Sequence, residues 1–200
     1  MVLWRHGQTV WNAEHRFQGQ TDIELDGTGV TQAERAARLL AALRPAVIVS
    51  SDLRRAAATA APLARLTGLE ISYDKDLRER SGGGWEGLTI AEIRERYPAD
   101  YANWMPADGE TAEAVAQRAS AAMERIAEAA RPGSLAVLVS HGAALRFGMS
   151  RLLGLADEQV WLLGPLANCS WSVLEQRRGH WRLLEHNAGT LPEPVLGDDR

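Results

Sequence analysis

The chain has 200 residues, 46% of them hydrophobic and 24% charged, which predicts one globular domain with a buried core. Its net charge of -4 argues against nucleic acid or a membrane surface as a partner, because such binders present a basic stripe. The single cysteine, Cys169, excludes an intramolecular disulfide framework. There is neither an apolar run of about 18 residues nor a leader sequence after Met1, so we expect a cytoplasmic protein.

Two apolar segments end in the same way. Residues 2–4 lead into Arg5 and His6, and residues 135–139 lead into Ser140 and His141. Short buried strands deliver polar groups at their carboxyl ends in open α/β sheets. If the two strands are parallel neighbours, both imidazoles emerge at one edge of the sheet.

Between and after these segments, predicted helices alternate with strands. We expect helices at 31–43 (capping box Thr31 and Glu34), 53–66 (capped from residues 50–52), 89–97 (capping box Thr89 and Glu92), 110–130 and 142–153. We expect strands at 46–49 and 71–73, a hairpin of 170–175 with 181–186, and loops at 11–20 and 77–87. The alternation predicts a three-layer α/β/α sandwich whose mixed sheet is mostly parallel with an antiparallel edge. One domain should cover residues 1–190, followed by a flexible tail at 191–200.

The polar residues at the predicted sheet edge suit a phosphate group. Arg5 adjoins His6, and Arg55 lies in the first turn of a helix that follows a strand, where free N–H groups also favour an anion. Arginine forks match phosphate oxygens, and their charge disfavours protonation of a nearby imidazole. We therefore interpret His6 as a nucleophile, His141 as a donor to the transferring oxygens, and Glu79 as the acid that protonates the leaving alkoxide.

Two other functions of these residues are less favoured. A metal site of two histidines and one carboxylate is disfavoured, because two arginines would repel a divalent cation and no His-Glu-x-x-His spacing occurs. A phosphate-sensing domain without catalysis would have lost one of the five residues that the chemistry needs, and none is missing. We expect no metal and no cofactor.

Four motifs are spread across most of the chain: Arg5-His6-Gly7, residues 51–56 with Thr59-Ala60, residues 77–79 with 85–87, and residues 139–142. Together they resemble the motifs of the histidine phosphatase (phosphoglycerate mutase-like) superfamily and stand in the same order. The resemblance implies a phosphohistidine on His6, a phosphate pocket completed by Arg5, Arg55 and His141, and protonation by Glu79. It also implies phosphate contacts from Asn12 and Gln18, and we add Gly142, beside His141, as a binding residue.

One departure from the family pattern concerns the acid. Gly82 stands where a bulky apolar residue is usual and begins a run of three glycines. Ordering glycines costs conformational entropy, so we expect Glu79 to be held less firmly than the phosphate-binding residues.

The resemblance also bears on the substrate. The segment between Glu79 and His141 is short for a mutase, which must shield its phosphohistidine from water, so a phosphatase is favoured. Residues 50–55 and 168–171 are most similar to those of bacterial glucosyl-3-phosphoglycerate phosphatases. We therefore expect a small phosphorylated metabolite, such as a phosphoglycerate or glucosyl-3-phosphoglycerate. A cofactor-dependent phosphoglycerate mutase, an α-ribazole phosphatase and a broad-specificity phosphatase stay as alternatives, a homodimer is left open, and Trp104 is a candidate for the pocket wall.

Overall fold

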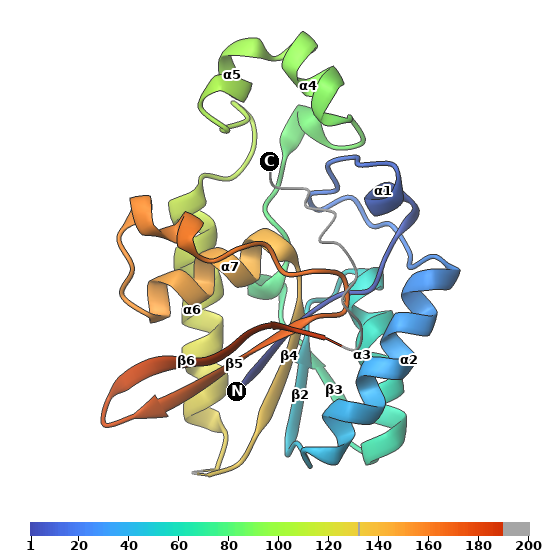
Figure 1. Ribbon diagram of the computed structural model, residues 1–200, viewed down its shortest axis with the longest axis vertical. Helices are drawn as coiled ribbons and strands as arrows, with labels where there is room; N and C mark the ends of the chain where they lie inside the picture. The colour runs from blue at the N-terminus through green and yellow to red at the C-terminus, as the bar shows by residue number, and fades with distance from the viewer. Residues whose placement is uncertain (132, 190–200) are drawn as a thin grey trace.

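A six-stranded sheet forms the centre of the protein (Figure 1), seen in a computed structural model that describes residues 1–131 and 133–189. The strands are β1 (Val2–Arg5), β2 (Val47–Ser50), β3 (Ile71–Tyr73), β4 (Ala136–Ser140), β5 (Trp171–Arg177) and β6 (His180–Ala188), in the order β3-β2-β4-β1-β5-β6. The first four in that order are parallel, and β5 and β6 are antiparallel to their neighbours. The predicted fold class is confirmed, while the predicted tail at 191–200 lies outside the described residues.

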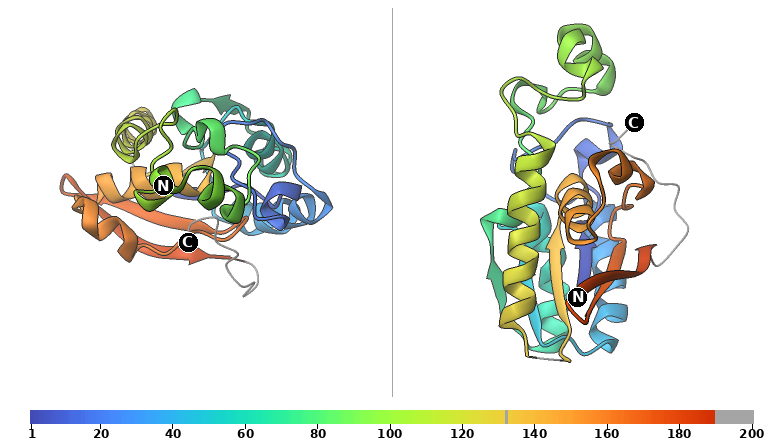
Figure 2. Two further views of the ribbon diagram at one scale, coloured as in Figure 1. Left: turned by 90° about the horizontal axis from the view of Figure 1, so that it is seen from above. Right: turned by 90° about the vertical axis from the view of Figure 1, so that its left-hand side faces the viewer.

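Helices cover both faces of the sheet because the central strands are apolar on both sides. On one face Val2, Trp4 and Val137 pack against α2 (Gly27–Ala42) and α3 (Arg54–Thr67). On the other, Leu3 and Leu138 pack against α6 (Ala112–Ala129) and α7 (Gly142–Leu152). Period-two alternation in a doubly covered sheet gives such continuous apolar runs, and the three layers can be followed in Figure 2.

Helix α2 begins one turn earlier than its predicted start at Thr31. Asp26 is the N-cap, since its carboxylate accepts from the N–H of Gly29 at 2.7 Å, while the Thr31 hydroxyl donates back to the Gly27 carbonyl. The glycines in the first turn concealed this start. Gly29 is needed there, because a Cβ on it would lie 2.1 Å from the carbonyl oxygen of Gln8, in the loop that follows His6.

The cap predicted for α3 is also wrong. Leu53 occupies the N-cap position with no side-chain hydrogen bond, because Ser51 contacts His141 and Asp52 pairs with Arg78 instead. The first N–H of the helix, that of Arg54, donates to Asp22 from a distant loop at 2.7 Å. Polar residues before this helix therefore serve the site and the loop beside it. Gly68 ends the helix in a left-handed conformation, as predicted.

The remaining helices extend past the carboxyl edge of the parallel strands. The segment expected to be loop at 11–20 contains a short helix, α1 (Val10–Ala13), capped by Thr9. Helix α4 (Ile90–Arg96) has the predicted Thr89 capping box, and α5 (Pro98–Ala102), which was not predicted, follows it; both stand clear of the sheet in Figure 1. Short 3-10 turns lie at Lys75–Leu77, Gly83–Trp85 and Asp157–Leu162. Among the described residues, none of the helices has the length and apolar character needed to cross a bilayer.

Candidate active site

The two histidines of the repeated strand motif lie side by side. Strands β1 and β4 are parallel neighbours with Arg5 opposite Ser140, so both chains reach the same edge in step. The rings of His6 and His141 have their centroids 5.2 Å apart at an interplanar angle of 57°. This confirms the geometric expectation that the sequence pattern raised.

The hydrogen-bond partners of each neutral imidazole indicate which ring nitrogen carries the proton. His6 Nδ1 lies 2.7 Å from the Gly7 carbonyl, which can only accept, so Nδ1 carries the proton and Nε2 keeps a lone pair. His141 Nδ1 faces the donor Nε of Arg55 at 3.2 Å, so its proton is on Nε2, which donates to the Ser51 hydroxyl at 2.9 Å. His6 thus has the tautomer of a nucleophile at Nε2.

Burial and positive charge keep both imidazoles neutral. Desolvation is the largest cause and, with Arg55 and Arg5 close by, holds the pKa of His6 well below 6.5. Desolvation likewise lowers the pKa of His141 well below 6.5, with Arg55 and His6 as further causes. The sequence pattern indicated the guanidinium groups as the cause of the low pKa, whereas loss of water is the stronger effect.

Two buried arginines flank the histidines. Arg5 is 3% exposed and donates to the Leu166 carbonyl at 2.5 Å. Arg55 is fully buried and, besides His141, binds the carbonyls of Thr21 at 2.8 Å and Gly19 at 2.7 Å. Burial lowers the pKa of Arg55 to about 10, so the group stays charged at neutral pH. These arginines form the fixed cationic part of the site.

Glu79 reaches the same place from the loop after β3. Its Oε1 accepts the N–H groups of Arg80 at 2.8 Å and Ala144 at 3.0 Å, and its Oε2 accepts that of Ala143 at 3.2 Å. The last two are free N–H groups at the start of α7, the helix that follows His141. The carboxylate is therefore attached to the element that also carries the second histidine.

One pocket is lined by His6, the two arginines and Glu79 together. It is lined by Arg5, His6, Phe17, Gln18, Gly19, Arg55, Glu79, Arg80, Trp104, Ala143, Arg146 and Phe147. Gln18 is buried, and its Oε1 has no hydrogen-bond partner among the residues that the structure describes. Sequence reasoning thus identified five of the lining residues as site residues and Trp104 as a wall candidate.

Three predicted site residues do not line the pocket. His141 is not among the lining residues; it is fully buried, beside the ring of His6 and bonded to Arg55. Gly142 starts α7, where a Cβ would lie 3.5 Å from the Arg5 guanidinium carbon. Asn12 uses its Oδ1 within its own helix, accepting from the N–H of Thr9 at 3.1 Å, and also accepts from Asn168 at 3.2 Å.

Sequence reasoning missed Arg80 and Arg146, which are each 3% exposed and line the pocket. Arg80 donates to the carbonyls of Glu110 at 2.8 Å and Trp104 at 3.1 Å. The Arg146 guanidinium carbon lies 4.8 Å from the centroid of Trp161, within cation–π range. The one available signal was position: Arg80 follows Glu79, and Arg146 lies on the helix that starts after His141.

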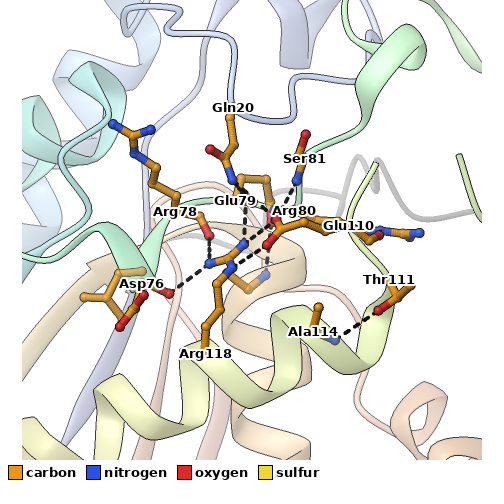
Figure 3. Close-up of polar contacts among 12 residues, drawn as sticks. Gln20, Asp76, Arg78, Glu79, Arg80, Ser81, Glu110, Thr111, Ala114 and Arg118 are labelled. Carbon is orange, nitrogen blue, oxygen red and sulfur yellow. Dashed lines mark hydrogen bonds and ion pairs between the residues drawn. The ribbon is translucent and has the colours of Figure 1, made fainter. Parts of the chain in front are cut away.

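A network of charged groups surrounds the main chain of Glu79 (Figure 3). Arg118, from α6, donates to the carbonyls of Asp76 at 2.8 Å, Arg78 at 2.6 Å and Glu79 at 2.9 Å. The same guanidinium binds both carboxylate oxygens of Glu110, at 2.7 and 2.8 Å. These contacts argue against the expectation that Glu79 is loosely held.

The glycine run beside this network is closely packed. A Cβ on Gly82 would lie 2.4 Å from a ring carbon of Phe17, and one on Gly83, whose φ is +52°, would lie 2.0 Å from Asp108. The N–H groups of Gly82 and Gly84 donate to Glu86 at 2.9 Å and Asp108 at 3.0 Å. The glycines therefore permit close approach, rather than marking a loose segment.

Within residues 1–131 and 133–189, no group of three or more histidine, cysteine or acidic residues could hold a metal ion.

The chain is similar to proteins of one family over nearly its whole length. The family model of the histidine phosphatase superfamily (branch 1) matches residues 1–189. Glucosyl-3-phosphoglycerate phosphatase of Mycobacterium tuberculosis is 39% identical over 194 residues, covering 90% of this chain and 86% of that protein.

Two further comparisons point the same way. The metal-independent phosphoserine phosphatase of Arabidopsis thaliana is 35% identical over 191 residues, covering 90% of this chain and 78% of that protein. The solved structure of mycobacterial glucosyl-3-phosphoglycerate phosphatase with VO3 superimposes with a TM-score of 0.90 at 38% identity, covering 94% of this chain and 98% of that one. The chain belongs to the histidine phosphatase superfamily and is a phosphatase of that type.

Proposed function

We propose that the chain hydrolyses small phosphomonoesters through a phosphohistidine on His6. The observation that carries this proposal is the neutral His6, with its lone pair on Nε2, in a pocket that also holds the guanidinium groups of Arg5 and Arg55. A buried neutral imidazole is a nucleophile, and fixed cations stabilise charge on the three phosphoryl oxygens in the transition state. His141 orients Arg55 through the bond to its Nε.

The reaction then proceeds in two steps. His6 Nε2 forms a bond to phosphorus while the ester P–O bond breaks, and Glu79 gives a proton to the departing oxygen. Of its two oxygens, Oε2 accepts the single, longer N–H bond and is the one we assign to that proton. In the second step Glu79 takes a proton from water as the water oxygen bonds to phosphorus and the P–N bond breaks, which returns His6 and releases inorganic phosphate.

We further propose that the alcohol carries a carboxylate. Among the lining residues four are arginines and one, Glu79, is acidic. A phosphomonoester dianion balances part of this charge, and Arg80 and Arg146 lie outside the pair that we assign to the phosphoryl oxygens. A phosphoglycerate or a glucosyl-3-phosphoglycerate has the required second anion, and the latter appears in the name of the mycobacterial relative. The aromatic faces of Phe17 and Trp104 suit the apolar face of a sugar.

The test uses two substrates that differ at one group: 3-phosphoglycerate and glycerol 3-phosphate. We expect kcat/KM to favour 3-phosphoglycerate by about 10-fold or more, the value of one charge-assisted hydrogen bond of about 1.5 kcal/mol. Arg146→Gln should remove much of that preference, whereas the exposed Arg151→Gln on the same helix should keep it. Equal rates for the two substrates in the unchanged protein would rule out the carboxylate. Conversion to 2-phosphoglycerate without phosphate release would instead identify a mutase.

A further inference from the structure

The main chain of Glu79, the proposed acid, is held by side chains that do not line the pocket. Glu79 lies in the segment between β3 and α4, whose only regular structure is two 3-10 turns. No strand ladder fixes its main chain, in contrast to His6 and His141, which directly follow paired strands. Some other set of contacts has to fix the direction in which the Glu79 side chain leaves the main chain.

The guanidinium of Arg118 makes those contacts. It binds the carbonyl oxygens of Arg78 and Glu79, which belong to the two peptide groups on either side of the Glu79 Cα. The Glu79 carbonyl also accepts from the Gln20 amide at 3.1 Å. An arginine suits this place because its five N–H groups form a rigid planar fork that binds several carbonyls and a carboxylate at once, whereas a lysine has only three donors on a single nitrogen.

Glu110 completes the arrangement by fixing Arg118 and the next stretch of main chain. Its side chain accepts the N–H of Ser81 at 2.8 Å, and its own N–H donates to the Ser81 carbonyl at 2.9 Å. Burial alone would raise the pKa of Glu110, but the bonds from Arg118 and Ser81 outweigh it and lower that pKa below its ordinary value. The Arg118 and Glu110 side chains are 18% and 25% exposed, so water screens the pair only weakly.

We propose that Arg118, held by Glu110, is a positioning residue for the proton donor: it fixes the main chain at Glu79 so that the carboxyl group faces the leaving oxygen. The proposal rests on the assignment of Glu79 as the acid. It predicts that the damage from removing Arg118 depends on the leaving group. Esters that need protonation lose rate, and esters with an acidic leaving group, which need none, do not.

The test compares 3-phosphoglycerate with 2,4-dinitrophenyl phosphate in Arg118→Met and Arg118→Lys. General acid catalysis and correct placement of its donor are each worth about 10²-fold, so we expect kcat/KM on 3-phosphoglycerate, which reports on the phosphorylation of His6, to fall by about 10- to 100-fold. On the dinitrophenyl ester kcat/KM should change by less than about threefold, because phosphorylation by this ester needs no acid and kcat/KM excludes the later step in which Glu79 acts as a base. Arg118→Lys should behave like Arg118→Met, because one ammonium group cannot replace the fork.

Arg125→Gln is the matched control. Arg125 lies seven residues further along the same helix and pairs with Asp74 and Asp76 of the same segment at 2.9 and 2.8 Å, but its side chain is 53% exposed. This variant should leave the ratio of the two rates unchanged. Turnover of the dinitrophenyl ester also reports, in each preparation, that the protein is folded and that His6 is reactive.

Combination with Glu79→Gln separates positioning from a general loss of structure. If Arg118 acts through Glu79, the double variant Glu79→Gln/Arg118→Lys is as slow on 3-phosphoglycerate as Glu79→Gln alone. Multiplied losses, or equal losses on both esters in the Arg118 variants, would overturn the proposal while leaving the acid in place. If Glu79→Gln itself showed no dependence on the leaving group, the proposed function of Glu79 would fail instead.

Discussion

The two sides of the pocket are built differently. The phosphate side consists of His6, Arg5 and His141 at the ends of paired parallel strands, together with Arg55 in the first turn of a helix. The acid side is a loop whose main chain is held by side chains from α6. Strand pairing places three of the four residues on the first side, whereas side-chain contacts, above all those of the Arg118–Glu110 pair, fix the main chain of the second. The phosphate side should therefore affect every substrate alike, and the acid side should affect substrates selectively.

The largest expected effect comes from the phosphate side. His6→Ala removes the atom that bonds to phosphorus, so we expect kcat to fall by about 10⁴-fold or more on every ester, the order of loss seen when a covalent nucleophile is removed. Stopped reactions of the unchanged protein should contain phosphate bound to histidine, and those of the variant should not. Residual turnover above about 1% in the variant would assign the nucleophile to another group.

A smaller and selective effect is expected from the acid side. Glu79→Gln keeps the size of the side chain but has no proton to donate, so kcat/KM on alkyl phosphates should fall by about 10²- to 10³-fold. On 2,4-dinitrophenyl phosphate kcat/KM, which reports on phosphorylation of His6 and excludes the later hydrolysis step, should stay within about threefold, because that leaving group needs no proton. Steady-state kinetics on both esters checks this, with phenyl phosphate as a substrate of intermediate leaving-group acidity. Equal losses on all three esters would contradict the difference between the two sides.

The same difference explains what the sequence could predict. The local sequence of residues 2–6 and 136–141 predicts both a strand and its place at the site, because each apolar run ends at a histidine. No local pattern marks Arg118 or Glu110 as part of the site. On an amphipathic helix, Arg118 reads as part of a solvated face, and only the folded chain brings it to Glu79. Long-range ion pairs leave no local pattern.

Tertiary hydrogen bonds account for the errors at helix starts. Polar residues before a helix are interpreted as caps, yet Ser51 and Asp52 are used by His141 and Arg78. At Asn12 the structure adds a role without deciding the predicted phosphate contact, because the Oδ1 that completes a capping box with Thr9 is an acceptor and only the Nδ2 group could donate to phosphate. The competition between capping and site contacts is decided by tertiary neighbours, which one sequence does not reveal.

The smallest expected effect concerns stability and again belongs to the phosphate side. The pKa values of His6 and His141 lie well below 6.5 in the folded chain, so below pH 6.5 the unfolded chain binds more protons than the folded one. The stability that the two neutral histidines contribute should therefore be fully present above pH 6.5. As the pH falls below that value it should decrease, by up to about 1.4 kcal/mol per pH unit for each histidine.

Urea unfolding at pH 7.5, 6.5 and 5.5 measures this slope, in a range where most carboxylates stay ionised in both states. His141→Asn should reduce the slope by removing one of the two buried imidazoles, and Arg118→Lys, on the acid side, should leave it unchanged. An unfolding free energy that is flat from pH 7.5 to 5.5 would mean that the histidines are not kept neutral by the fold. That result would remove the basis for a nucleophile whose lone pair is already available at neutral pH.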